Sequence, residues 1–138
     1  MPSLADMLKP SMQTLKNIVL TIRVHAHYED VDPLFGIPSE FEVMRSRNII
    51  ETVTIKINVD ADAGYRRDEW GRLDKVLTTP GWFSLKRVSL TIEIVPYLGR
   101  SNEVEVSLRN LPETQFRRLS SSNSVSFNFE VNPPYYPK

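Results

Sequence analysis

"LKNIVLTIRV" (residues 15–24) and "LKRVSLTIEI" (residues 85–94) are nearly the same ten-residue phrase at two places in a chain of 138 residues. A third stretch, from Ile50 to Val59, has the same apolar spacing, and the three copies begin 35 residues apart. A fourth copy, from Val125 to Val131, keeps only the alternating part and arrives 37 positions after its counterpart in the third. Repetition at a fixed period of this length indicates a repeat architecture, in which each copy supplies one equivalent structural unit.

Each copy predicts one β-strand with a single buried face, because β-branched and other apolar residues alternate with polar ones. We expect strands near residues 17–27, 50–60, 85–96 and 124–132, all within one domain that spans residues 1–138. The segments between strands have about twenty-five residues, which is too long for a hairpin and suits a crossover through a helix. Neighbouring strands are therefore expected to be parallel.

The connectors are predicted to contain helices of unequal quality. "DEWGRLDKVL" (residues 68–77) carries an apolar stripe at helical spacing, and "SNEVEVSLRNLP" (residues 101–112) carries another that Pro112 should end. The two stripes consist of Trp70, Leu73 and Leu77, and of Val104, Leu108 and Leu111. The first connector offers "SEFE" (residues 39–42), which resembles a capping box and has only Phe41 and Met44 to bury, so we expect a short or irregular helix there.

The alternation also predicts that helices cover only one face of the sheet. In a doubly wound parallel sheet both faces are buried, and the strands read as continuous apolar runs. These strands alternate cleanly, so their second face should be exposed to water. The expected fold class is α/β, a short βα solenoid of about four parallel strands with helices on one face.

The exposed face is predicted to be polar and of mixed charge. With the four copies aligned, Glu93 should lie beside Glu130, in a row that also contains Arg23 and Asn58. Solenoids present extended surfaces to protein partners, and mixed charge suits specific contacts. We therefore predict a non-enzymatic protein-recognition or scaffold module whose partner-binding residues are Arg23, Lys56, Asn58, Glu93 and Glu130.

The composition disfavours several classes of partner. The chain has 17 basic and 17 acidic residues, so no net charge draws it to nucleic acid or to an anionic membrane. It has no cysteine, which excludes disulfides and thiolate metal sites. The N-terminal region lacks the unbroken apolar run of a secretory signal, and no stretch approaches the length of a membrane span. We expect a cytoplasmic or nuclear protein with an unknown protein partner.

The apolar spacing and two longer stretches of the sequence each resemble a known protein family. The L-x-x-L-x-L spacing resembles the leucine-rich repeat, at the longer period of 35 residues. The stretches "YRRDEWGRLDKVLTTPGWFSLKRVSLTIEI" (residues 65–94) and "LPETQFRRLSSSNSVSFNFEV" (residues 111–131) resemble the irregular leucine-rich C-terminal region of F-box-type proteins of mushroom-forming fungi. The resemblance implies a repeat region that recruits a substrate to a ubiquitin ligase. The F-box itself is not expected in this chain, because about fourteen residues precede the first strand.

The histidines of "HAHYED" (residues 25–30) are the sharpest candidates for chemistry. On a strand His25 and His27 point the same way, and Glu29 or Asp30 could add a carboxylate to a zinc or iron site. A metal site needs three or four ligands, and the chain has no other histidine. Two solvent-facing histidines at a strand end are therefore the favoured interpretation, and a metal-dependent enzyme is the less favoured alternative.

No other motif predicts an enzyme or a cofactor. Glu93 and Glu130 could form a carboxylate pair, but on an open face they are better interpreted as solvated charges. The serines of "SSSNS" (residues 120–124) lack a G-x-S-x-G turn, and the five glycines form no phosphate-binding loop. We expect Trp70 and Trp82 to fill the core rather than to stack on a ligand.

Residues 133–138, "PPYYPK", are expected to form an extended tail, because prolines favour the polyproline form.

A further alternative is that the chain is a truncated repeat fragment without independent activity. Its first and last strands would then be exposed edges, which tend to pair with other chains and would allow self-association.

Overall fold

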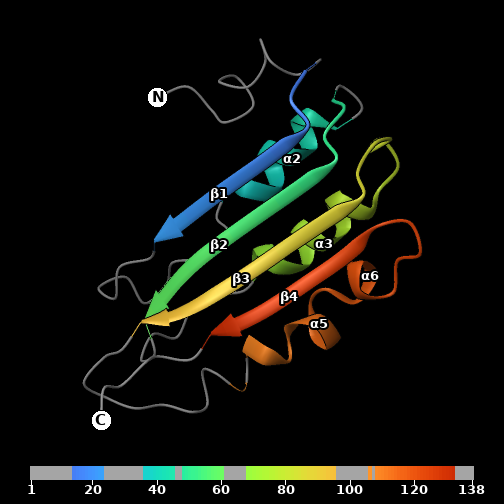
Figure 1. The fold of residues 1–138 in the computed structure, drawn as a ribbon. Coiled ribbons are helices and arrows are strands. Elements are labelled where there is room, and N and C mark those ends of the chain that lie inside the picture. Colours follow the sequence, from blue (N-terminus) through green and yellow to red (C-terminus); the bar gives the residue numbers. More distant parts are fainter. Residues whose placement is uncertain are drawn as a thin grey trace.

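The computed structural model describes residues 14–23, 36–45, 48–60, 68–95, 106 and 108–132. The described part contains a four-stranded sheet in which the strands follow the order of the sequence and all run parallel (Figure 1). The strands are β1 (Asn17–Arg23), β2 (Thr52–Asp60), β3 (Arg87–Val95) and β4 (Ser126–Asn132). The helices are α2 (Ile37–Met44), α3 (Asp68–Thr78), α5 (Leu111–Thr114) and α6 (Arg117–Ser120). The expected α/β class with a parallel sheet is thereby confirmed.

The first three strands pair with the offset that the repeat predicts. Asn17 lies opposite Thr52, and Thr52 lies opposite Arg87, so partners are 35 residues apart in both pairs. The same offset holds along the whole of both ladders. The sequence period is therefore the physical register of the sheet, because each copy places equivalent residues side by side.

The fourth strand is displaced by two residues from the predicted alignment. Phe127 lies opposite Val88, whereas the alternation alone places Val125 there. A shift of two residues keeps every side chain on its own face, so the alternation cannot distinguish the two registers. The extra residues lie before the strand, where the hydroxyl of Ser122 accepts hydrogen bonds from the backbone N–H groups of Ser124 (3.3 Å) and Val125 (3.1 Å).

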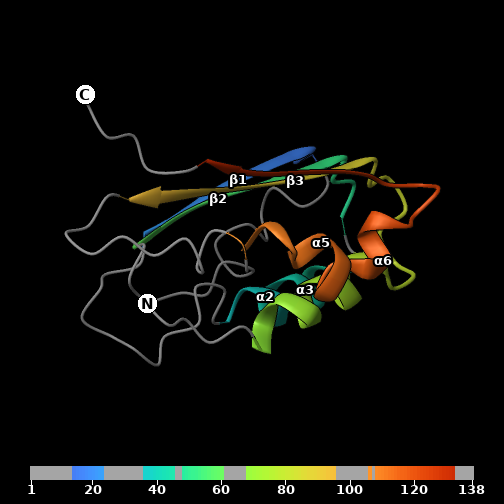
Figure 2. The ribbon, with the colours of Figure 1, turned by 90° about the horizontal axis from the view of Figure 1, so that it is seen from below.

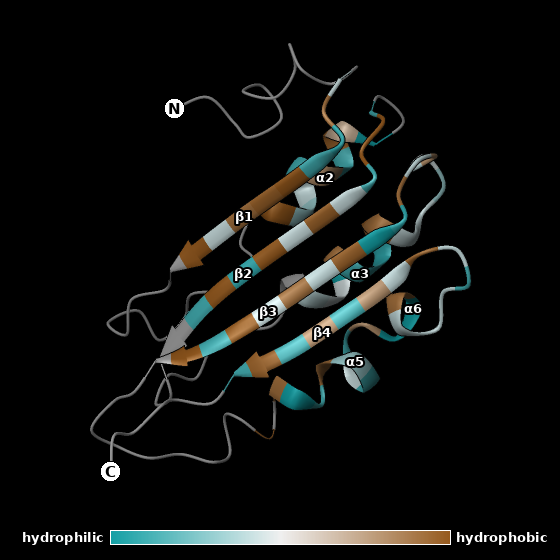
Figure 3. Cartoon of the chain, in the orientation of Figure 1, coloured by the Kyte–Doolittle hydropathy of each residue, from teal (hydrophilic) through white to brown (hydrophobic). Residues whose placement is uncertain are grey.

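One face of the sheet is buried and the other is left open by the described elements. Figure 2 shows the four labelled helices on the same side of the sheet, and Figure 3 shows the hydropathy alternating along the strands. The buried side carries three apolar rows, which are Ile18–Val53–Val88–Phe127, Leu20–Ile55–Leu90–Phe129 and Ile22–Ile57–Ile92–Val131. Both the expected one-sided helix layer and the expected alternation are therefore present.

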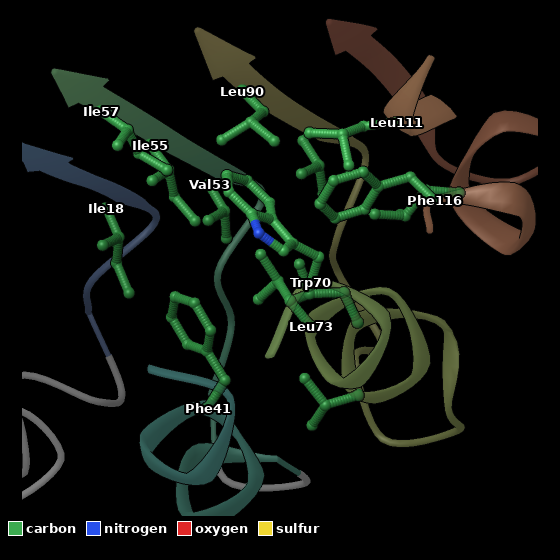
Figure 4. Close-up of a cluster of buried hydrophobic side chains, with 14 of the residues drawn as sticks. Ile18, Phe41, Val53, Ile55, Ile57, Trp70, Leu73, Leu90, Leu111 and Phe116 are labelled. Atoms are coloured by element: carbon green, nitrogen blue, oxygen red, sulfur yellow. The ribbon is translucent and has the colours of Figure 1, made fainter. Parts of the chain in front are cut away.

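Helix α3 provides the central contact between the helix layer and the sheet. Its predicted stripe is correct, since Trp70, Leu73 and Leu77 are each 1% exposed. In Figure 4 the labelled side chains of α2 and α3 point toward the sheet. The indole N–H of Trp70 is buried without a hydrogen-bond partner among the described residues. That group costs about 1–3 kcal/mol, which the apolar burial of the ring has to outweigh.

Helix α2 is short, as expected, but it begins earlier than the predicted capping box. Gly36 is the N-cap residue, and no side chain caps the helix, so Ser39 lies inside the helix. The backbone at Gly36 has a φ of 82°, a left-handed conformation that favours glycine. Pro38 is tolerated because first-turn N–H groups have no partner within the helix. Phe41 and Met44 are buried as predicted.

Pro112 begins a helix rather than ending one, which corrects the prediction for the third connector. It lies in the first turn of α5, where its missing N–H removes no helical hydrogen bond. Leu108 and Leu111 of the predicted stripe are buried, and Val104 lies outside the described residues. Among the described residues of this connector, 106, 108 and 109 are helical within the predicted range, and α5 and α6 follow them as two further short helices.

Aromatic side chains join α3, the third connector and β4. The ring centroid of Phe116 lies 5.8 Å from that of Trp70 in an edge-to-face contact. The same ring lies 5.5 Å from Phe127 and 6.4 Å from Phe129 on the strand. These contacts favour the observed register of β4, because aromatic pairs at such distances add stability beyond their buried area.

Candidate recognition surface

The predicted binding residues lie on the open face, which we define as the outward-facing residues of the four strands. Three of its rows across the four strands carry charges, and they are Asn17–Thr52–Arg87–Ser126, Thr21–Lys56–Thr91–Glu130 and Arg23–Asn58–Glu93–Asn132. Lys56, Glu93 and Glu130 are exposed, and Asn58 is half-buried. The backbone of Arg23 belongs to β1, but its side chain lies outside the described part of the structure.

The predicted pairing of Glu93 with Glu130 is wrong. Glu130 lies opposite Thr91, and Glu93 lies opposite Asn132, because β4 is displaced by two residues. The two carboxylates are diagonal neighbours on adjacent strands, with Cα atoms about 8 Å apart from the strand spacing and the rise per residue. The displacement therefore removes a row of like charges, and with it the geometric basis for a carboxylate pair that shares a proton.

The open face carries charges of both signs. Lys56 stands on β2 and Arg87 on β3, and the carboxylates of Glu93 and Glu130 stand on β3 and β4. Lys56 and Glu130 share a row with Thr91 between them, so their Cα atoms are about 10 Å apart at two strand spacings. No ion pair joins these two side chains in the described part of the structure, so both remain available to an external partner.

A further set of charged residues lies just before the strands, at the equivalent positions 16, 51 and 86. The ammonium of Lys86 lies 3.1 Å from the carboxylate of Glu51, and Lys16 occupies the equivalent position in the first copy. The hydrogen bond and charge of Lys86, with a smaller contribution from Lys16, hold the pKa of Glu51 below its usual value. Charges of alternating sign at residues 16, 51 and 86 support the in-register pairing. The 35-residue period could have revealed this set.

Asp74 is a buried carboxylate that sequence reasoning did not identify. Its side chain accepts hydrogen bonds from the backbone N–H groups of Arg118 (3.1 Å) and Leu119 (2.8 Å), in the first turn of α6. Burial raises the pKa of Asp74, and these two hydrogen bonds and the charge of Arg118 oppose the rise. The residue thus caps one helix from another, since first-turn N–H groups lack partners within their own helix. Its position on the buried stripe of α3 was an available signal.

The metal hypothesis concerns residues that the structure does not describe. His25 and His27 both lie outside the described ranges. Within those ranges, no group of three or more His, Cys, Asp or Glu side chains could hold a metal ion. The candidate residues that the structure places together are therefore the polar and charged side chains of the open face.

Comparison of the chain with protein-family models, with curated proteins and with solved structures finds no match. Among the described helices, none has the length and apolar character required to cross a bilayer. The surface geometry and the sequence are thus the observations from which a function can be inferred.

Proposed function

We propose that the chain is a non-enzymatic protein-recognition module that binds a protein partner through the open face of its sheet. The observation that supports this function is the alternation of burial along four parallel strands, which leaves a polar surface beside a covered apolar one. A sheet face without a covering layer offers preformed, rigid positions for side chains, so binding requires little ordering of the chain. Mixed charge on such a face favours specific partners over non-specific ones.

The positions of Lys56, Glu93 and Glu130 on the open face specify the partner further. A complementary protein surface would place a carboxylate near Lys56 and a cation near Glu93 and Glu130. The matching groups on the partner should lie about 10 Å apart, as two strand spacings require. Recognition of this kind weakens as salt concentration rises, because exposed charges are screened over about 8 Å at physiological ionic strength.

We also propose that the βα units are repeats of a leucine-rich-repeat-like solenoid related to the substrate-recruiting region of F-box-type proteins. The uniform 35-residue register of β1, β2 and β3 supports this relation. A module of that kind would act by holding a protein substrate, and its own residues would carry out no reaction. The cytoplasm or nucleus would be its place of action.

Site-specific crosslinking tests the proposed surface. A photoreactive phenylalanine derivative at Thr91, in the middle of the open face, should crosslink to a partner in extract from the cells that express the chain. The matched control is the same group at Glu113, which is exposed on α5 in the helix layer. Glu93→Arg should abolish the Thr91 crosslink and Glu113→Arg should preserve it, with unchanged circular dichroism for both. Equal crosslinking at both positions, or no effect of Glu93→Arg, would reject the proposed surface.

Self-association is the second candidate function, and the sheet topology favours it. In the order β1-β2-β3-β4, the strands β1 and β4 each pair with one neighbour among the described strands. Unpaired strand edges are templates for pairing with another chain. Sedimentation velocity over a wide concentration range separates the two functions, since edge pairing predicts a dimer that forms with concentration. A monomer at every concentration would rule out edge pairing as the function.

A further inference from the structure

The turn between α3 and β3 is held in place by contacts on both sides. Trp82 is buried, and its indole N–H donates a hydrogen bond to the carbonyl oxygen of Val76 at 2.8 Å. Arg45 on the α2 side donates to the carbonyl oxygen of Pro80 at 3.2 Å. Gly81, between Pro80 and Trp82, has a φ of 128°, a backbone conformation that residues with a side chain rarely adopt. The turn is therefore attached to the core by the buried ring of Trp82 and to α2 by the hydrogen bond from Arg45.

This fixed turn presents an aromatic side chain to water. Phe83 is 81% exposed, although Trp82 before it and Leu85 two residues later are both buried. A single exposed apolar residue requires no explanation by itself. An exposed aromatic ring has only two side-chain torsions to order on binding, and such rings dominate the energy of many protein interfaces.

Phe83 also lines a groove, which is a second and independent observation. The groove has a volume of about 630 Å³ and lies between this turn and the segment that leads into β4. Its apolar lining includes Leu77, Leu85 and Val125. The segment opposite Phe83 is ordered by the hydroxyl of Ser122, which accepts hydrogen bonds from two backbone N–H groups. The volume falls within the usual range for binding pockets.

The charges that line the groove have one sign. Among the described residues that line it, Lys86 and Arg118 are the only charged ones, and both are exposed. Lys86 is paired with Glu51 and remains 74% exposed, and the carboxylate of Asp74 is buried and accepts hydrogen bonds from the backbone N–H groups of Arg118 and Leu119. An occupant that carries carboxylates therefore complements the rim, while an apolar side chain complements the floor.

We propose that this groove is a docking site for an acidic protein segment that places one apolar side chain against Phe83. The site lies at the beginning of the strands and on the turn, so it is separate from the glutamate-bearing rows of the open face. An apolar anchor surrounded by acidic residues would bury its side chain on Leu85 and Val125, and would keep its carboxylates near Lys86 and Arg118.

Selection from a library of random linear peptides displayed on phage tests this proposal. The enriched peptides should share one apolar residue flanked by Asp or Glu. A synthetic peptide of the selected sequence should bind the chain at least about tenfold more weakly when Phe83→Ala or Arg118→Glu is introduced, as for truncation of an interface anchor. Val43→Ala is the matched control, because Val43 is also exposed, at 63%, but lies on α2.

The result that would overturn the proposal is equally specific. Failure to enrich any peptide, enrichment of peptides without acidic residues, or equal binding to Phe83→Ala and the unmodified chain would each contradict it. Thermal unfolding of each variant shows whether the fold is retained, which is expected because Phe83, Arg118 and Val43 are all exposed. Binding should also weaken as the salt concentration is raised.

Discussion

The two faces of the sheet are made from the same four strands but follow different rules. The covered face carries Ile, Val, Leu and Phe in three continuous rows, and nearly every one of these side chains contacts the helix layer or its neighbours. The open face carries mainly Thr, Ser, Asn, Lys, Arg and Glu at the intervening positions, with Val19 as an exposed apolar residue on β1 (Figure 3). The residues of the covered rows therefore determine the fold, whereas those of the open rows can vary and are available for binding.

The largest expected effect is the difference between a charge on the covered face and the same charge on the open face. Leu90 is 1% exposed in β3, and Leu90→Asp buries a carboxylate without a partner. That cost is several kcal/mol, comparable with a total stability of about 5–15 kcal/mol. We expect Leu90→Asp to unfold the domain, as measured by circular dichroism.

The adjacent residue provides the control for that substitution. Thr91 faces outward between Lys56 and Glu130, so the attraction and repulsion felt by a new carboxylate largely cancel. Thr91→Asp should change the free energy of unfolding by about 0.5 kcal/mol or less. If the two variants unfold alike in urea, the assignment of the faces is wrong.

The next largest effect is expected at Phe116, whose ring packs between α3 and β4 on the covered face. Phe116 is 0% exposed and touches the rings of Trp70, Phe127 and Phe129. Phe116→Ala should lower the free energy of unfolding by about 3–5 kcal/mol, because it leaves a cavity in the core. Asn128→Ala on the open face of β4 should have little effect. Urea denaturation of the two variants measures the contrast.

A smaller effect is expected at the buried polar group of the covered side. Asp74→Ala removes the acceptor of two backbone N–H groups of α6, and should cost about 1–3 kcal/mol. The N-cap residue of α6 is Phe116, and no side-chain hydrogen bond caps the helix at that position, so the cap cannot take over the role of Asp74. Thermal or urea unfolding at neutral pH checks this loss, and an unchanged stability would show that α6 does not depend on Asp74.

The contribution of Asp74 to the free energy of unfolding should change with pH in one direction. The pKa of Asp74 is raised above its ordinary value of 3.8 in the folded protein, so the folded state holds the proton more tightly than the unfolded state. Its contribution to stability is therefore greatest below 3.8 and is lost as the pH rises through the raised pKa. The unfolding free energy of the unmodified chain, relative to Asp74→Asn, should increase as the pH falls through this window. A difference that decreases would contradict the buried state of the carboxylate.

Sequence reasoning succeeded wherever a local pattern determined the structure. The alternation predicted the strands and their faces, and the 35-residue period predicted the register of β1, β2 and β3. The helical stripe of Trp70, Leu73 and Leu77 predicted the buried side of α3. In each case neighbouring residues along the chain were sufficient, because the repeat copies one unit with the same internal geometry.

Sequence reasoning failed wherever contacts distant in the chain decided the outcome. The register of β4 depends on Phe116 and on the Ser122 turn, and a shift by two residues leaves the alternating pattern unchanged. Pro112 is compatible with either end of a helix by its chemistry alone. The role of Asp74 requires α3 and α6 to be adjacent, and the exposure of Phe83 depends on the burial of Trp82 beside it.

Cysteine labelling on the central strand β2 is the most direct test of a sheet that is covered on one face and open on the other. The chain has no native cysteine, so Val53→Cys and Lys56→Cys each introduce a single thiol, at a residue that is 0% exposed and at one that is exposed. Under native conditions Lys56→Cys should react with a thiol reagent nearly as fast as it does in urea. Val53→Cys should react at least about a hundredfold more slowly, because its exposure requires unfolding. Equal rates, or protection of the thiol at position 56, would contradict the account.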